Sequence, residues 1–508
     1  MLLRTGDLIT IIVYFVFTMG IGFWFMRRNK STDDYFKGGG KIPFWAAGMS
    51  LLATAISSIS FLAYPGIAYA SDWSLIVPGL MLPFAALIGA FVFAPFYRAS
   101  RFTSAYEYLE GRFSPGVRMY AVVLYLIQQV WRLGSVLYLL SIPIKLMTGV
   151  EPFWVILVVG ICTTVYCFVG GLEAVIWTDV VQTFVLLSGG LITVLIVFFT
   201  PGVGPGFVFD TAVENHKFNI TANTDFTWFT EKTIWVLILY GLVQNVQEHV
   251  SDQIKVQRYC SVKDETAAKR AVMFNGILCI PVWFLFMFVG TCLYAFYKVK
   301  VDPTVAGIEN PDEVFPHFII TQMPVGLSGL VIAAVMAAAM STLSSSMNSS
   351  ATVLTVDIVK RYLAPNRDDH YYLNIGKFMT ALGGVLMIVT ALVVSKYLKE
   401  AFLPISFFIT SLTFGGLGGL FCIGFFSTRA NARGIAIGLV ATVAVTIYLA
   451  LSDRQIMPEG WNSPTHNFMI GVFSNFVAFF VGLFASLLFA RPPESKIRKA
   501  TFWTLEKE

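Results

Sequence analysis

The chain has 508 residues, of which 56% are hydrophobic and only 13% are charged, and its mean hydropathy is +0.72. Because a water-soluble domain carries about 25% charged residues, this chain lacks the polar surface to fold in water alone. The net charge of +5 is small and no basic run is interleaved with exposed aromatic residues, which excludes a nucleic-acid-binding protein. The composition predicts an all-α, polytopic membrane protein.

Apolar runs of about 20 residues predict thirteen membrane-spanning helices. Their approximate limits are 8–26, 44–67, 74–97, 117–147, 152–170, 173–200, 232–250, 270–297, 319–359, 372–396, 402–426, 432–451 and 466–490. The run 319–359 is too long for one straight span, so we expect it to begin as an extracellular helix or to tilt strongly. The first run lacks a basic leader and a cleavage site, which favours a retained span over a signal peptide.

The distribution of lysine and arginine predicts the orientation. If the loop after the first span is cytoplasmic, that side collects 25 of the 35 basic residues, Lys255 and Arg258 among them, and the other side nine. The remaining one, Arg132, lies within a span. The rule therefore places the chain in the cell membrane, plasma or inner, with its N-terminus outside and its C-terminus in the cytoplasm.

The second span holds a cluster of small and hydroxylated residues, Ala53 to Ser60, followed by Pro65 and Gly66. This pattern indicates a helix interrupted within the membrane, whose freed carbonyls could coordinate a cation. The alternative is a proline-kinked helix that packs closely through its small residues.

The ninth span carries eight polar residues between Ser341 and Ser350. Ser341, Ser344, Ser345 and Asn348 follow one another at helical spacing and form a single stripe. Hydroxyl and carbonyl oxygens suit a small hard cation such as sodium, which favours cation ligands over simple close packing.

Two charged residues lie inside predicted spans. Asp179, in the sixth, must pair with a cation or stay protonated unless it snorkels to a helix end. Arg132, in the fourth, requires an anionic partner, either a solute carboxylate or a protein acid such as Glu248. Glu248 belongs to the polar run 244–249, which we expect to interrupt the seventh span as 53–60 interrupts the second. Broken helices five spans apart are typical of an inverted-repeat transporter.

With these residues in view, the chain resembles the sodium:solute symporter family, which includes sodium–sugar and sodium–sialic acid cotransporters. The resemblance is carried by TDDYFKGGGKIPFWAAGMSLLATAISSISF (32–61), TSAYEYLEGRF (103–113), VGGLEAVIWTDVVQ (169–182), VQRYC (256–260) and AAVMAAAMSTLSSSMNSS (333–350). It implies a ten-helix, LeuT-type core built from two inverted repeats, 44–200 and 232–426. An extra N-terminal helix (1–27), two extra C-terminal helices (432–490) and a cytoplasmic tail (491–508) would complete the chain.

The resemblance also implies specific sites. A first sodium ion would be held by the carbonyls of Ala53, Ile56 and Ala338 and the hydroxyls of Ser341 and Thr342. A second would be held by Asp179, Ser341, Ser344 and Ser345. Arg132 matches the arginine that holds the sialic acid carboxylate, and the expected solute site comprises Ser57, Ser60, Leu75, Gly79, Arg132, Asn245, Glu248 and His249. The family's glutamine in the third span is Gly79 here, after Pro78, and Glu248 and His249 also depart from the family pattern.

The expected function is therefore sodium-coupled import of a sialic acid or another carboxylated sugar, with two sodium ions and by alternating access. A neutral sugar, a polyol or a monocarboxylate is the alternative solute, and a sodium-dependent solute sensor is the alternative of another class. The five histidines are scattered and no H-E-x-x-H motif occurs, so no enzymatic activity is expected. Sodium, the solute and the lipid bilayer are the expected partners, with no obligate protein partner.

Overall fold

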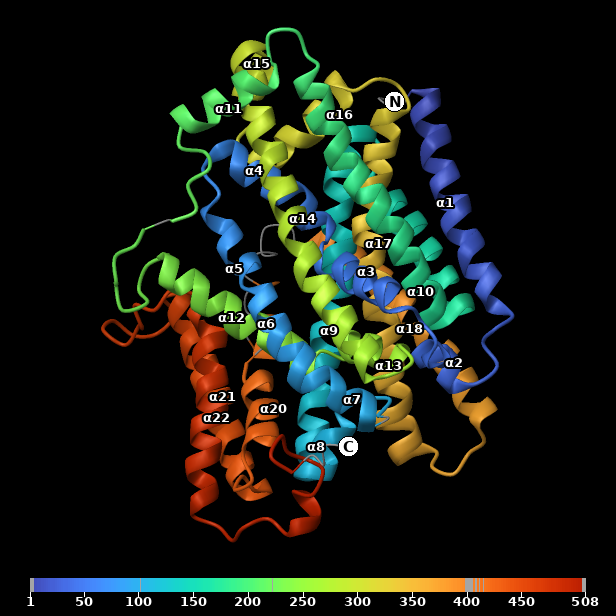
Figure 1. Cartoon of the computed structure of the whole chain (residues 1–508), viewed down its shortest axis with the longest axis vertical. Coiled ribbons are helices and arrows are strands. Elements are labelled where there is room, and N and C mark those ends of the chain that lie inside the picture. The colour runs from blue at the N-terminus through green and yellow to red at the C-terminus, as the bar shows by residue number, and fades with distance from the viewer. Residues whose placement is uncertain are drawn as a thin grey trace.

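The structure, a computed structural model, describes residues 4–504 apart from 101, 222, 398–404, 407–408, 411 and 414. Within these residues the chain forms helices and two isolated β-bridges, but no strand. The helices run side by side as a bundle (Figure 1). The longer ones and those near the site are α1 Thr5–Met26, α3 Phe44–Ala55, α4 Ser58–Ala70, α5 Val77–Leu80, α6 Leu82–Ile88, α7 Ala94–Ser100, α8 Glu107–Arg112, α9 Pro115–Thr148, α10 Pro152–Phe198, α11 Pro205–Glu214, α12 Ile234–Ser251, α13 Gln253–Ser261, α14 Glu265–Val299, α16 Val314–Gln322, α17 Leu327–Val353, α18 Asp369–Tyr397, α20 Leu417–Phe426, α21 Ala432–Asp453 and α22 Met469–Leu487.

Nine helices in the described part of the chain are long and apolar enough to cross a membrane, or ten if the bent pair α3 and α4 is taken as one span. The predicted spans 152–170 and 173–200 form one continuous element, α10, which Gly171 divides. The predicted span 232–250 corresponds to α12. The predicted span 402–426 falls partly outside the described residues, and its described helix is α20.

Gly171 shows why the chain can turn within α10. Its φ of 59° lies in the left-handed region, and a Cβ atom there would lie 2.8 Å from the Tyr35 ring. Only glycine fits a position that combines positive φ with such a close contact. The two halves of α10 can therefore follow different directions without a connecting loop.

The long apolar run 319–359 is divided as the sequence indicated. It includes the end of the short helix α16, the break from Met323 to Gly326, and α17 with its π-helical continuation η5, Leu354–Leu363. Asp7 of α1 accepts hydrogen bonds from the backbone N–H groups of Gly326 and Gly329 and so caps the start of α17.

Helix α17 lies at the centre of the bundle. It packs against α1, α9, α10 and α18, and every side chain from Val331 to Val353 is buried. Its many hydroxyl groups therefore face other helices and not lipid. A stripe of oxygen atoms at this place can act only on groups inside the protein.

Both helix breaks occur, but one of them lies elsewhere than predicted. Between α3 and α4 the backbone is extended at Ile56 and Ser57, and the two helices are bent by 58°. In the seventh span, by contrast, the prediction that 244–249 interrupts the helix is wrong. Helix α12 continues to Ser251, and the break falls at Asp252, before α13.

The polar run 244–249 stays helical because its side chains find local partners. Asn245 donates to the carbonyl of Gly241 one turn earlier, and Gln244 donates to Glu248 one turn later. Asp252 instead accepts a hydrogen bond from the backbone N–H of Ile254 and so starts a new helix.

Candidate functional site

The polar stripe of α17 lies directly against the break that ends α3. The hydroxyl of Ser341 donates to the carbonyl of Ala53 at 3.0 Å and to the carbonyl of Ala338 at 3.1 Å. Thr342 donates to the same Ala338 carbonyl at 3.4 Å. Ile56, fully buried, sits at the break itself. The residues expected to hold the first sodium ion thus lie together, and most of their oxygen atoms are within hydrogen-bond distance of one another.

Asp179 of α10 lies beside the same stripe and is fully buried. Its Oδ2 atom accepts a hydrogen bond from Ser50 at 2.5 Å, and the hydroxyl of Ser345 lies 3.5 Å away. Its Oδ1 atom is buried without a hydrogen-bond partner in the described structure. Because a buried carboxylate oxygen requires a donor or a cation, the free Oδ1 fits a cation ligand. Ser344 donates to the carbonyl of Ser341, and no hydrogen bond joins it to Asp179 in the described structure.

Arg258 of α13 also reaches Asp179, and the sequence reasoning missed this. Its Nη2 atom lies 3.5 Å from Asp179 Oδ2 and donates to Ser345, while its Nε donates to Ser50 at 3.1 Å. The side chain is fully buried. The assignment of Arg258 to the cytoplasmic loops is therefore wrong. A count of basic residues in each loop does not distinguish a guanidinium that is buried in the protein from one that is exposed to water.

Arg132 projects from α9 and is half-buried. In the described part of the structure it makes no hydrogen bond and no ion pair. The carboxylates of Glu248 and Asp252 lie within electrostatic range of it but do not form a bridge with it. Glu248 instead pairs with the buried Lys255 at 3.0 Å. Lys255, like Arg258, is thus not a charge of an exposed loop.

The remaining predicted solute residues lie at the helix breaks and on α12. Ser57 and Ser60 open α4, where the side chain of Ser57 accepts the backbone N–H of Ser60. Asn245 donates to the carbonyl of Pro78, beside Gly79. Leu75, which is half-buried, precedes Pro78 and Gly79 in the chain. The ring of His249 is buried against Tyr259, with Nδ1 2.8 Å from its hydroxyl, so its observed contacts are structural.

Gly79 lies against Trp283 of α14. A Cβ atom at position 79 would lie 3.1 Å from the indole Nε1, and this buried N–H has no partner among the described residues. The absence of a side chain at 79 therefore leaves room for an indole donor. In the sequence, only the replacement of the family's glutamine by Gly79 indicated that this position is unusual. Nothing in the sequence indicated that Trp283 of α14 lies beside it.

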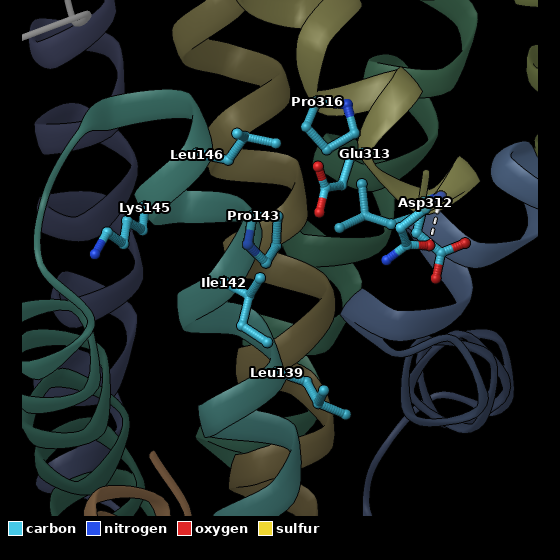
Figure 2. Close-up of a pocket in the computed structure, with 10 residues that line it drawn as sticks. Leu139, Ile142, Pro143, Lys145, Leu146, Asp312, Glu313 and Pro316 are labelled. Carbon is cyan, nitrogen blue, oxygen red and sulfur yellow. Dashed lines mark hydrogen bonds between the residues drawn. The ribbon is translucent and has the colours of Figure 1, made fainter. Parts of the chain in front are cut away.

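A cavity of about 490 Å³ lies further along the same helices. It is lined from α4 by Leu62 and from α9 by Leu139, Ile142 and Pro143. The short 3₁₀ helix η4, Pro311–Glu313, contributes Asp312 and Glu313. In Figure 2 the α9 side chains face these acids, whereas Lys145 extends away from them. Arg132 lies seven residues before Leu139, about 10 Å along α9. The cavity thus lies about two turns of α9 beyond Arg132.

Comparisons with known proteins agree with this geometry. Residues 35–441 match the sodium:solute symporter family. The chain is 33% identical to the sodium/sialic acid symporter SiaT of Proteus mirabilis over 92% of each chain. It is 34% identical to the sodium/sialic acid symporter NanT of Aliivibrio fischeri over 88% of each chain. A solved substrate-bound, outward-open Na⁺-coupled sialic acid symporter superposes with a TM-score of 0.88 at 30% identity, covering 96% of this chain and 98% of that one.

Proposed function

Because the chain belongs to the sodium:solute symporter family, we propose that it imports a carboxylated sugar of the sialic acid class together with two sodium ions. One observation carries the choice of solute. Arg132 is a half-buried guanidinium that forms no ion pair among the described residues. Glu248 pairs with Lys255 instead, and Asp252 is near enough to interact electrostatically but forms no bridge with Arg132. A guanidinium holds a carboxylate with two parallel hydrogen bonds, which favours a carboxylated solute.

The two sodium ions would act by joining helices. An ion between the Ala53 carbonyl and the Ser341 hydroxyl connects the break of α3 to α17, and so fixes the start of α4, which carries Ser57 and Ser60. A second ion on Asp179 Oδ1 would join α10 to the same stripe. Binding of sodium would thereby complete the solute site, and closure of the outer cavity followed by inward opening would release both.

Energetics favour two ions over one for an anionic solute. A tenfold sodium gradient supplies roughly 1.4 kcal/mol per ion, and 100 mV supplies roughly 2.3 kcal/mol per net charge. One sodium with one carboxylate moves no net charge, so it concentrates the solute only about tenfold. Two sodium ions with the same anion supply about 5 kcal/mol, enough for several thousandfold accumulation.

We further propose that the N-terminus faces the outside and the C-terminus the cytoplasm of the plasma or inner membrane, and that the protein transports without catalysing a reaction. In Figure 1 the N-terminus lies at the end of the bundle with α11 and α16, and the C-terminus lies towards the other end, near α8. The excess of basic residues at the α8 end persists when the buried Arg112, Arg118, Lys255 and Arg258 are set aside.

A monocarboxylate is the second candidate solute, and the glycine at position 79 favours it. The missing side chain at 79 removes a polar group that a polyhydroxylated sugar could use, while Arg132 can still hold a carboxylate. Among the described residues, no feature comparable to Arg132 favours a neutral sugar.

The substitution Arg132→Ala tests the carboxylate directly. Removing a hydrogen bond to a charged group costs about 1.5–3 kcal/mol, so affinity for N-acetylneuraminic acid should fall by roughly 10- to 150-fold. Binding is measured as thermal stabilisation of the purified protein in sodium, with the methyl ester of the same sugar as matched ligand. Unchanged affinity of the variant for the free acid would show that Arg132 does not hold the carboxylate.

A further inference from the structure

One buried carboxylate, Asp179, is held by Arg258 and also carries a free oxygen that the proposed second sodium ion would use. Asp179 accepts Arg258 and Ser50 on Oδ2, while Oδ1 stays without a partner. Ser345, a proposed ligand of the second sodium, also accepts a hydrogen bond from Arg258. The guanidinium therefore uses two of the groups that the second sodium ion would use. This inference rests on the proposed function, because it concerns the second sodium site.

We propose that Arg258 is a tethered cation that competes with the second sodium ion for Asp179 and so sets the sodium affinity of that site. Both charges lie in a buried environment, where repulsion between a guanidinium and an ion on the same carboxylate is weakly screened. Without sodium the guanidinium balances the carboxylate. When sodium binds at Oδ1, Arg258 must share Asp179 with it or move away.

The contacts of Arg258 indicate where such a movement would act. Its Nη1 donates to the carbonyl of Ile254 within α13, and its other nitrogens reach Ser50 on α3 and Ser345 on α17. Arg258 is thus a polar connection from α13 to the two helices that form the sodium sites. Because α13 follows the break at Asp252, loosening this connection would release the segment beyond the break of the seventh span.

A purely structural role for Arg258 and a role in competition with sodium lead to different predictions. If the guanidinium only holds α13 in place, its loss destabilises the protein equally at every sodium concentration. If it competes with sodium, its loss leaves Asp179 without a balancing cation. Sodium should then bind more tightly and should restore the lost stability.

The test is a sodium titration of thermal stability on the purified full-length protein without solute, with choline replacing sodium at constant ionic strength. Arg258→Gln should be less stable than wild type in choline, should recover in sodium, and should reach half-maximal stabilisation at a sodium concentration at least tenfold lower. Arg258→Lys keeps the charge and should stay within about threefold of wild type. Adding Asp179→Asn to Arg258→Gln should abolish the tightened binding, because it removes the shared carboxylate.

The matched control is Arg118→Gln, which breaks a buried pair of Arg118 with Asp357, 2.6 Å apart, away from both sodium sites. Its stability should fall equally with and without sodium. Sodium binding by Arg258→Gln that is no tighter than wild type would overturn the proposal. The proposal would also be overturned if high sodium did not restore the thermal stability of Arg258→Gln although the double variant folds. Sodium would then not replace the guanidinium. Since the titration contains no solute, failure of wild type to import a carboxylated sugar would overturn the proposed function but not this inference.

Discussion

The hydroxyl of Ser341 on α17 donates a hydrogen bond to the carbonyl of Ala53 on α3, 3.0 Å away, although 288 residues separate the two in the chain. This contact joins the helix break of the second span to the polar stripe of the ninth. Both groups are buried, so the pair forms an oxygen-lined point inside the bundle. The proposed sodium coupling depends on this convergence.

Substitution of Ser341 by alanine should weaken sodium binding at this point. The variant loses one oxygen ligand and leaves the Ala53 carbonyl without its present donor, so half-maximal uptake should require about tenfold more sodium or higher, equivalent to about 1.4 kcal/mol. Ser346→Ala is the matched control, because the Ser346 hydroxyl is buried on the same helix without a partner in the described structure. Equal sodium dependence of both variants and wild type would show that Ser341 is not a ligand.

Asp179→Ala should change the number of ions and not only their affinity. Without the carboxylate the second ion loses its charged ligand, so the dependence of uptake on sodium should become less steep, from two ions to one. Maximal accumulation of a carboxylated solute should then fall from several thousandfold towards tenfold. Uptake by proteoliposomes over a sodium series measures both quantities. A variant with the same steep dependence would exclude the two-sodium proposal.

Trp283→Phe should test whether the indole N–H serves the solute. The change keeps the ring that packs against Tyr64 but removes the unpartnered donor beside Gly79. If the solute accepts a hydrogen bond from Nε1, its affinity should fall by about 2- to 13-fold, the effect of losing about 0.5–1.5 kcal/mol. Competition by solutes with and without ring hydroxyls would show which group is recognised. An unchanged ranking of solutes would place Trp283 outside the solute site.

Lys217, in the segment between α11 and α12, should produce a measurable pH dependence of stability. Its ammonium donates to the carbonyls of Tyr69 and Ser71 at the end of α4. Burial lowers the pKa of Lys217 to about 8, although nearby Asp72 acts in the opposite direction. Because the unfolded chain keeps this proton up to a pH of about 10.4, unfolding takes up a proton between these values.

Wild type should therefore gain stability relative to Lys217→Met as the pH rises from about 8 to about 10, by on the order of 1–3 kcal/mol, with no relative change below about 8. Thermal unfolding of both proteins across this range measures the difference, and all other titrating groups are common to the two. Parallel stability profiles would show that Lys217 keeps an ordinary pKa.

The sequence predicted a break within 53–60, and the structure places it at Ile56 and Ser57. The stripe 341–350 has a similar composition but stays helical in α17, and Pro65 lies inside α4, so composition alone does not fix where a helix breaks. The break at Asp252 was missed because side chains one turn apart, Asn245 and Gly241, or Gln244 and Glu248, keep a polar run helical. Local partners of this kind cannot be recognised from polarity alone.

In the candidate site, too, some residues could be predicted from the sequence and others could not. Asp179 and the stripe of α17 could be singled out because polar groups within apolar spans are rare and costly. Arg258 and Trp283 could not, because their importance comes from the direction of a side chain and from neighbours far away in the chain. The domain limits 44–200 and 232–426 stay predictions, since part of the second repeat lies outside the described residues.

The most direct test of sodium coupling is the paired flux of radiolabelled sodium and N-acetylneuraminic acid into proteoliposomes that contain the wild-type protein. We expect two sodium ions to enter with each solute, a current of one positive charge per cycle, and no uptake when K⁺ or choline replaces Na⁺. Uptake that persists in K⁺ or choline, or a ratio of one sodium per solute without current, would contradict the coupling proposed for the Ala53–Ser341 and Asp179 sites.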